Sequence, residues 1–186
     1  MSTTADPKST LVAELRKHAL VIGDVTLTSG KQASYYVDAK RAILLPAGFQ
    51  ALGALVADEA QRLGGTAIGG MTMGADPVAC AGLAGGFDGK AFFVRKASKA
   101  HGLQRRVEGP FLTDDDRCVV VEDIVTTGGS TVEAIEALQA EGRTIVGVIS
   151  VLDRLAGGAD RITAACGAPY VALTTIDEIY PDRPAS

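Results

Sequence analysis

The sequence contains no tryptophan, and aromatic residues make up only 5% of its 186 residues. It also lacks a run of about 20 apolar residues, which is the length that a membrane-spanning helix needs. The N-terminus is polar and includes Asp6 and Lys8, unlike the start of a secretory signal. These absences argue against a membrane protein and against a membrane partner. We therefore expect a soluble protein of the cytoplasm.

Cysteine is scarce as well, and its pattern argues against a disulfide-rich or zinc-binding protein. The three cysteines are Cys80, Cys118 and Cys166. They are odd in number, lie far apart, and fall within or beside apolar segments, as buried thiols in a reducing compartment do. Neither disulfides nor a zinc site is expected.

Size and charge limit the remaining possibilities. A chain of 186 residues with 47% hydrophobic content can build one well-buried core, but hardly two domains. The formal net charge of −4 provides no general attraction to nucleic acid or to an anionic surface. An anion-binding site must therefore collect its positive charge locally.

Hydrophobic periodicity predicts an α/β fold. Helices are expected over residues 11–19 (closed by Gly23), 46–63, 76–84 and 131–141, and strands over 66–69, 91–94, 118–121 and 144–151. Residues 25–37 suggest a short hairpin that serves as a hood, and residues 1–8 a loose start. Strands that alternate with helices imply right-handed crossovers and a mainly parallel sheet, which binds ligands at the carboxyl ends of its strands.

The most informative segment covers residues 119–131. An apolar run leads into Glu122 and Asp123, and residues 126–130 then form a Thr/Gly/Ser turn before a helix. Glycines in such a turn let backbone N–H groups converge on an anion, and the start of a helix favours negative charge. The hydroxyls of residues 126, 127, 130 and 131 can add donors. The two acids would repel phosphate, so they suit sugar hydroxyls, reached directly or through a divalent cation.

Acids at the end of a parallel strand also occur around unrelated pockets, so this arrangement alone is weak. Two other nucleotide motifs are absent: there is no G-x-x-x-x-G-K-[ST], and no G-x-G-x-x-G follows an expected strand. The whole segment points to a ribose phosphate.

A second informative segment is basic and lies within residues 95–117, which lack regular periodicity. Its cations and one of the two histidines are Arg95, Lys96, Lys99, His101, Arg105 and Arg106. A solvated basic face is one explanation, and a nucleic-acid patch is another, although no aromatic residue is interleaved to stack on bases. Beside a ribose-phosphate loop, the cluster would instead clamp a diphosphate. A long polar loop in a small α/β domain is often a lid.

Together these segments resemble a known family. The acidic pair followed by Thr-Thr-Gly-Gly-Ser resembles the phosphoribosyl diphosphate (PRPP) signature of type I phosphoribosyltransferases. Arg-Lys-x-x-Lys-x-His-Gly over residues 95–102 resembles the catalytic loop of orotate phosphoribosyltransferases. Residues 28–31 with 35–38, residues 69–77, and Asp153-Arg154 resemble further motifs of that family. The resemblance covers about residues 20–155.

The resemblance implies one phosphoribosyltransferase domain over residues 1–186. It implies a mainly parallel central sheet flanked by helices, a small N-terminal hood at 20–45 and a flexible catalytic loop at 95–110. It also implies Mg²⁺-dependent transfer of the 5-phosphoribosyl group from PRPP to orotate, in de novo pyrimidine biosynthesis. The family works as a homodimer with shared active sites, and neither nucleic acid nor membrane is a partner.

The same resemblance assigns roles to individual residues. The catalytic residues would be Lys99, His101 and Asp123. The PRPP-binding residues would be Arg95, Lys96, Lys99, His101, Glu122, Asp123, Ile124, Val125, Thr126, Thr127, Gly128, Gly129 and Ser130. Thr126 and Arg154 would bind orotate, with Lys31 as a further candidate. Mg²⁺ would be held mainly by the substrate, with Glu122 or Asp123 as protein ligands.

The chain departs from the family pattern at two positions. Thr28 and Met73 stand where many members carry lysine, so the ligand contacts there are weaker or redistributed, and Lys31 could substitute. Two other functions stay open: a phosphoribosyltransferase for another base, and a regulator that senses PRPP. The histidine-containing loop and Arg154 favour orotate over another base. The basic loop residues argue against a sensor, which has no leaving group to stabilise. For Arg154 alone, a surface ion pair with Asp153 is the simpler explanation.

Overall fold

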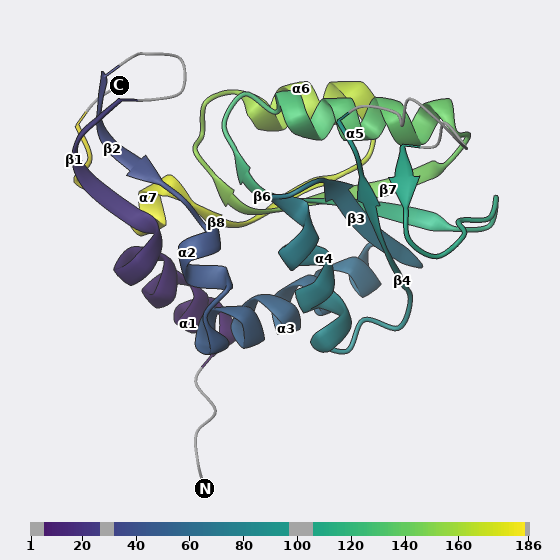
Figure 1. The fold of residues 1–186 in the computed structure, drawn as a ribbon, viewed down its shortest axis with the longest axis horizontal. Coiled ribbons are helices and arrows are strands. Elements are labelled where there is room, and N and C mark those ends of the chain that lie inside the picture. Colours follow the sequence, from purple (N-terminus) through teal and green to yellow (C-terminus); the bar gives the residue numbers. More distant parts are fainter. Residues whose placement is uncertain (1–5, 27–31, 97–105, 185–186) are drawn as a thin grey trace, which may run out of the picture.

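The computed structural model describes residues 6–26, 32–96 and 106–184. These residues form a six-stranded sheet, in the order β5-β4-β3-β6-β7-β8, and a separate two-stranded sheet (Figure 1). The pairs β4/β3, β3/β6, β6/β7 and β7/β8 are parallel, and only the edge strand β5 is antiparallel. The mainly parallel sheet expected from the sequence is confirmed.

The strands of the large sheet carry the residues that build the site. They are β3 (Ala67–Met71), β4 (Lys90–Val94), β5 (Val107–Glu108), β6 (Arg117–Val125), β7 (Thr144–Asp153) and β8 (Tyr170–Thr175). The central strand β6 alternates between two apolar clusters, because successive side chains of a strand point to opposite faces. Val119 and Val121 belong to one cluster, while Cys118 and Val120 belong to the other.

Helices cover both faces of this sheet. On one face lie α3 (Pro46–Arg62) and α4 (Ala75–Ala84), and on the other lie α5 (Gly129–Ala140) and α6 (Gly158–Cys166) (Figure 1). Pro46 at the first helical position of α3 agrees with its preference for helix starts, and Gly64 beyond its end adopts a left-handed φ of 70°. The sheet is therefore buried between two helical layers, as parallel sheets usually are.

The N-terminal part forms the hood at one end of the sheet. It contains α1 (Pro7–Glu14), a π-helical turn η1 (Leu15–Ala19), the antiparallel strands β1 (Leu20–Thr26) and β2 (Gln32–Val37), and α2 (Lys40–Ile43). The C-terminal helix α7 (Ile176–Ile179) lies beside it (Figure 1). The expected helix does not extend to Gly23. It ends at Ala19, and Gly23 lies within β1 with a φ of 140°.

Several other boundaries differ from the expectation. Pro7 and Lys8 are helical, with Asp6 as the N-cap, so they do not belong to a loose start. The strand expected over 118–121 runs from Arg117 to Val125. Strand β5 lies inside the stretch expected to be irregular, and α2, α6, β8 and α7 were not expected at all. Cys118 is buried as expected, whereas Cys80 is exposed. No helix in the described ranges is long and apolar enough to span a bilayer.

Candidate functional site

The expected phosphate-binding loop joins the carboxyl end of β6 to the start of α5. Gly128 caps α5 with φ 73°, a left-handed conformation that glycine adopts without strain. A Cβ at this position would also lie 3.0 Å from the carbonyl oxygen of Gly158. Residues 126–130 thus turn into a helix whose first N–H groups have no partner within the helix. The turn into a helix start that the sequence predicts after the acid pair is therefore present.

Glu122 lies on the face of the sheet that α5 covers. Its Oε2 atom accepts hydrogen bonds from Ser130 Oγ at 2.7 Å and Thr131 Oγ1 at 3.0 Å. Burial raises the pKa of Glu122 to about 7, although these hydrogen bonds oppose the shift. Because both hydroxyls donate to Glu122 here, the loop's remaining anion donors are its backbone N–H groups and threonine hydroxyls.

Asp123 lies on the opposite face, toward α4 and the hood. Its Oδ1 accepts from the backbone N–H of Ile124 at 2.8 Å, and its Oδ2 lies 3.2 Å from Lys40 Nζ. Gly74 packs so closely that a Cβ there would stand 2.4 Å from Oδ1. The carboxylate is 9% exposed and is therefore held on three sides.

Arg154 is brought to the same end of the sheet by the pairing of β6 with β7. Val125 lies opposite Asp153 in the parallel register, and the Arg154 N–H donates to the Val125 carbonyl oxygen at 2.9 Å. The guanidinium lies 5.2 Å from the ring centroid of Tyr35 and donates to its hydroxyl at 3.2 Å. Arg154 is thus held against the hood rather than paired with its neighbour.

Asp153 instead forms part of the sheet's interior. It is 3% exposed, and its carboxylate accepts from the Leu155 N–H at 2.7 Å and from the Tyr170 hydroxyl at 3.0 Å. Burial raises the pKa of Tyr170 well above its ordinary value, so its hydroxyl remains a donor at neutral pH. The ion pair considered from the sequence as an explanation for Arg154 is therefore not the arrangement found.

The two ends of the basic loop lie side by side. Arg106 donates to the carbonyl oxygens of Arg95 and Lys96, each at 2.9 Å, and to Glu133 of α5 at 2.5 Å. Arg95 also lies 3.5 Å from Glu108. The base of the loop is thereby tied to the helix that follows the phosphate loop. The predicted residues Lys99 and His101, and the candidate Lys31, lie outside the described ranges, as does Thr28.

The turn after β3 lies beside Asp123. The peptide bond between Thr72 and Met73 is cis, and the Met73 side chain is 71% exposed. Thr72 Oγ1 donates to Asp76 at 3.1 Å, while burial raises the pKa of Asp76. A Cβ on Gly70 would stand 2.1 Å from the Val121 carbonyl oxygen, so β3 and β6 approach closely at this point. No charged side chain stands at position 73 to receive a phosphate.

The side chains available as metal ligands determine how a divalent cation could bind. Within residues 6–26, 32–96 and 106–184, no group of three or more His, Cys, Asp or Glu side chains could hold a metal ion. Mg²⁺ commonly binds through one or two carboxylates together with substrate phosphates and water. Both acids of β6 already have partners here, two hydroxyls at Glu122 and the Ile124 N–H and Lys40 at Asp123. Asp123 is the more exposed of the two, at 9% against 4%.

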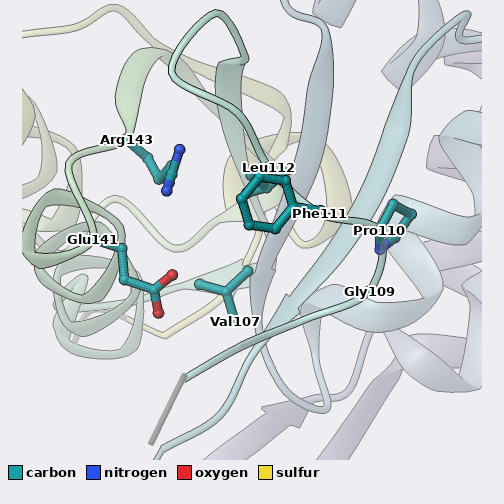
Figure 2. Close-up of a pocket in the computed structure, with 7 residues that line it drawn as sticks. All are labelled: Val107, Gly109, Pro110, Phe111, Leu112, Glu141 and Arg143. Atoms are coloured by element: carbon teal, nitrogen blue, oxygen red, sulfur yellow. The ribbon is translucent and has the colours of Figure 1, made fainter. Parts of the chain in front are cut away.

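A cavity of about 300 Å³ lies elsewhere in the molecule (Figure 2). Its lining residues are Val107, Gly109, Pro110, Phe111, Leu112, Glu141 and Arg143. They come from β5 and the segment that follows it, and from the turn after α5, on the side away from the carboxyl ends of the strands. None of the predicted site residues lines it.

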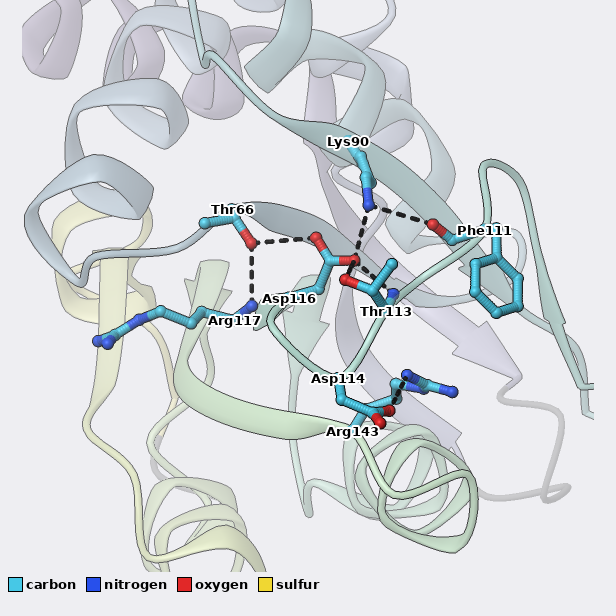
Figure 3. A network of polar contacts seen from close by, with 8 residues as sticks. All are labelled: Thr66, Lys90, Phe111, Thr113, Asp114, Asp116, Arg117 and Arg143. Carbon is cyan, nitrogen blue, oxygen red and sulfur yellow. Dashed lines mark hydrogen bonds and ion pairs between the residues drawn. The ribbon is translucent and has the colours of Figure 1, made fainter.

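A polar network closes the amino-terminal end of β6 (Figure 3). Asp116 accepts from Lys90 Nζ at 2.7 Å, from the Thr113 N–H at 2.6 Å and from Thr66 Oγ1 at 3.2 Å. Burial raises the pKa of Asp116, but these hydrogen bonds outweigh it and lower the pKa to about 2. The network fixes the start of the strand that carries the acid pair at its other end.

Sequence reasoning did not identify two residues of the site. Lys40 contacts Asp123 across 83 positions, and Tyr35 contacts Arg154 across 119. The segment containing Tyr35 was singled out, but its contact with Arg154 was not. No local periodicity could have indicated either contact.

Comparison with known proteins agrees with this geometry. The family model "Phosphoribosyl transferase domain" matches residues 57–166. The orotate phosphoribosyltransferase of Streptomyces avermitilis is 46% identical, with 94% of this chain and 97% of that protein covered. That of Corynebacterium glutamicum is 44% identical, with 96% of each chain covered.

Solved structures show the same similarity. The Mycobacterium tuberculosis orotate phosphoribosyltransferase in complex with Fe(III) dicitrate has a TM-score of 0.85 at 39% identity, covering 94% of this chain and 99% of that one. The structure of that enzyme in complex with PRPP has a TM-score of 0.80 at 34% identity, covering 93% and 98%.

Proposed function

Because the chain belongs to the orotate phosphoribosyltransferases, within the phosphoribosyl transferase family, we propose that it joins PRPP and orotate in a Mg²⁺-dependent reaction. The 5-phosphoribosyl group passes to N1 of orotate and gives orotidine 5′-monophosphate and diphosphate. This reaction belongs to de novo pyrimidine biosynthesis. The residue roles, the metal and the dimer described below are parts of the proposal.

One observation carries the assignment of the site. The register of β6 and β7 pairs Val125 with Asp153, and Arg154 N–H donates to the Val125 carbonyl at 2.9 Å. The guanidinium therefore starts from the strand end next to the phosphate loop. A planar guanidinium offers two parallel hydrogen bonds, which match the carboxylate of orotate. Thr126, between the two elements, would contact the same base.

The sugar would be held by the loop and the acid pair. Backbone N–H groups and hydroxyls over residues 126–130 would bind the 5′-phosphate, and the carboxylates of Glu122 and Asp123 would accept from the ribose hydroxyls. When the C1–O bond breaks, its electron pair leaves with the diphosphate and positive charge develops on the sugar ring. Carboxylates near the ring favour that charge. The bond to C1 then forms from N1 of orotate, which gives up its proton.

The leaving diphosphate would be stabilised by the basic loop. Arg95 and Lys96 lie at its base, and Lys99 and His101 follow in the sequence. His101 could donate a proton to the diphosphate, since imidazole titrates near neutral pH. Closure of the loop would exclude water, which competes with orotate for PRPP. The hydrogen bond from Arg106 to Glu133 supports this role, because it anchors the C-terminal end of the basic loop to α5.

A Mg²⁺ ion bound with PRPP would add positive charge at the leaving group. Glu122 or Asp123 would supply a protein ligand, and Asp123 is the more exposed of the two, at 9% against 4%. Most of the coordination would come from the substrate and water. This arrangement agrees with the lack of a three-residue cluster in the described ranges.

The resemblance also leads us to propose a homodimer with shared active sites, in which the basic loop reaches the partner's site. Exposed apolar side chains on the hood and the β3 turn support a contact surface: Ile22 is 64%, Leu44 60% and Met73 71% exposed. A cytoplasmic location is part of the proposal, and the three free cysteines suit a reducing compartment.

The first test is the loss of orotate ultraviolet absorbance after PRPP and Mg²⁺ are added to the purified protein. Uracil and hypoxanthine serve as parallel acceptors, and a chelator tests the metal. We expect consumption of orotate alone, abolished by the chelator. If no base is consumed while PRPP still binds, a PRPP-sensing regulator becomes the better explanation.

A further inference from the structure

Lys40 connects the hood to the acid pair. It is the first residue of α2, and its Nζ lies 2.8 Å from Asp38 Oδ1 and 3.2 Å from Asp123 Oδ2. Its backbone N–H also donates to Asp38 Oδ1 at 3.2 Å. One ammonium group thus bridges two carboxylates that are 85 positions apart in the sequence, one in the hood and one in β6.

This bridge keeps its charge at neutral pH. Burial lowers the pKa of Lys40, but the hydrogen bond to Asp38 and the charge of Asp123 outweigh it, so the pKa is raised. Without the ammonium, Asp38 and the 9%-exposed Asp123 would face each other as like charges. The ammonium therefore offsets the repulsion between the two carboxylates in this arrangement.

The bridge also fixes the orientation of Asp123. Oδ1 is held by the Ile124 N–H at 2.8 Å, and the place beside it is closed by Gly74. Oδ2 is the oxygen that is left, and Lys40 is the cation that the described part of the chain brings to it. Three contacts from three elements thereby define one rotamer of the carboxylate.

We propose that Lys40 is a positioning residue for the transfer reaction. It holds Asp123 in the orientation that accepts the ribose hydroxyls, and it couples that orientation to the hood. The Lys40 side chain is 38% exposed. This inference rests on the proposed function, because it assumes that Asp123 contacts the ribose of PRPP.

The test compares Lys40→Met, which removes the charge, with Lys40→Arg, which keeps it. For Lys40→Met we expect kcat/KM for PRPP to fall roughly tenfold to a hundredfold, the scale seen when the support of a functional group is lost. The KM for orotate should change by less than about twofold. Lys40→Arg should recover most of the loss. A purely structural lysine would instead weaken both substrates equally, without rescue by arginine.

A matched control is Lys90→Met. Lys90 also pairs with a buried carboxylate, Asp116, at 2.7 Å, but at the far end of β6. The Lys90→Met variant should have a lower melting temperature and an unchanged KM for PRPP. If Lys40→Met fails to fold, the double variant Asp38→Asn/Lys40→Met also removes the Asp38 charge that would be left unpaired. Its kinetics are then compared with those of Lys40→Arg.

Calorimetric titration with PRPP separates this inference from the proposed function. If the wild-type protein binds PRPP but consumes no orotate, the proposed reaction is wrong, and the loss of PRPP affinity in Lys40→Met still tests the bridge. If the wild type is active and Lys40→Met binds and turns over PRPP equally well, the positioning role is refuted.

Discussion

Replacement of Gly74 by alanine should disturb the acid pair without any direct contact with a substrate. Gly74 has φ −63° and ψ −41°, so the backbone itself accepts alanine. The added Cβ, however, would stand 2.4 Å from Asp123 Oδ1 and 2.8 Å from its Cγ. To reach an ordinary van der Waals separation, the carboxylate must retreat by about 1 Å.

The size of the effect follows from the contacts that Asp123 would lose. Overpacking of this kind costs about 1–3 kcal/mol of stability. In a chain of this length that corresponds to a melting temperature lower by about 2–12 °C. A displacement of about 1 Å at a reacting group can cost a hundredfold in rate, so kcat/KM for PRPP should fall by about that factor.

The assay is orotate consumption at varied PRPP, together with thermal unfolding of Gly74→Ala, Asp123→Ala and the double variant. Asp123→Ala removes the atoms that the new methyl group would strike. The two stability changes should therefore be strongly non-additive. Full activity in Gly74→Ala, or additive stability changes across the cycle, would refute the reasoning.

Three further predictions concern other parts of the site. Lys99→Ala should lower turnover at least about a hundredfold, the scale of one lost transition-state donor, and near-normal turnover would contradict the role of the basic loop. Arg154→Ala should raise the KM for orotate more than the KM for PRPP in steady-state kinetics, and equal rises would make Arg154 structural. Asp116→Asn should lower the free energy of unfolding by about 2 kcal/mol at pH 7, measured with urea, because Lys90 loses its charged acceptor. The Asp116 pKa is lowered from 3.8 to about 2, so this difference should vanish as the pH falls through that interval, and a constant difference would argue against the ion pair.

The order of the central elements could be predicted because each has a clear pattern. Residues 118–121 are an apolar run, and Pro46 and Gly64 bracket a helix of ordinary spacing. The strand nevertheless continues to Val125, since Glu122, Ile124 and Val125 remain paired with β7 and the side chains of both acids find partners. An apolar run marks where a strand is buried, and polar residues with partners can extend it.

The elements after Asp153 could not be predicted in the same way. The apolar stripe of α6 is short: Ile162 is buried, and Ala165 and Cys166 pack beside it on the same core cluster. Strand β8 is an edge strand with mixed burial. The contacts of Lys40 and Tyr35 depend on how the hood docks against the sheet, which is a tertiary event. Sequence motifs located the phosphate loop and the acids. The contacts of Lys40 with Asp123 and of Tyr35 with Arg154 form only when the hood docks against the sheet.

The two acids are adjacent in sequence and interact electrostatically, but their other partners differ. Successive residues of β6 point to opposite faces, so Glu122 meets the hydroxyls of α5 while Asp123 meets Lys40 and Gly74. Burial raises the pKa of Glu122 to about 7, and near neutral pH its carboxyl exists in both protonation states. Asp123 instead lies beside an ammonium whose own pKa is raised. In the proposed reaction, Asp123 is therefore the carboxylate that is paired with a cation, while Glu122 is held against the start of α5 by its two hydroxyl donors.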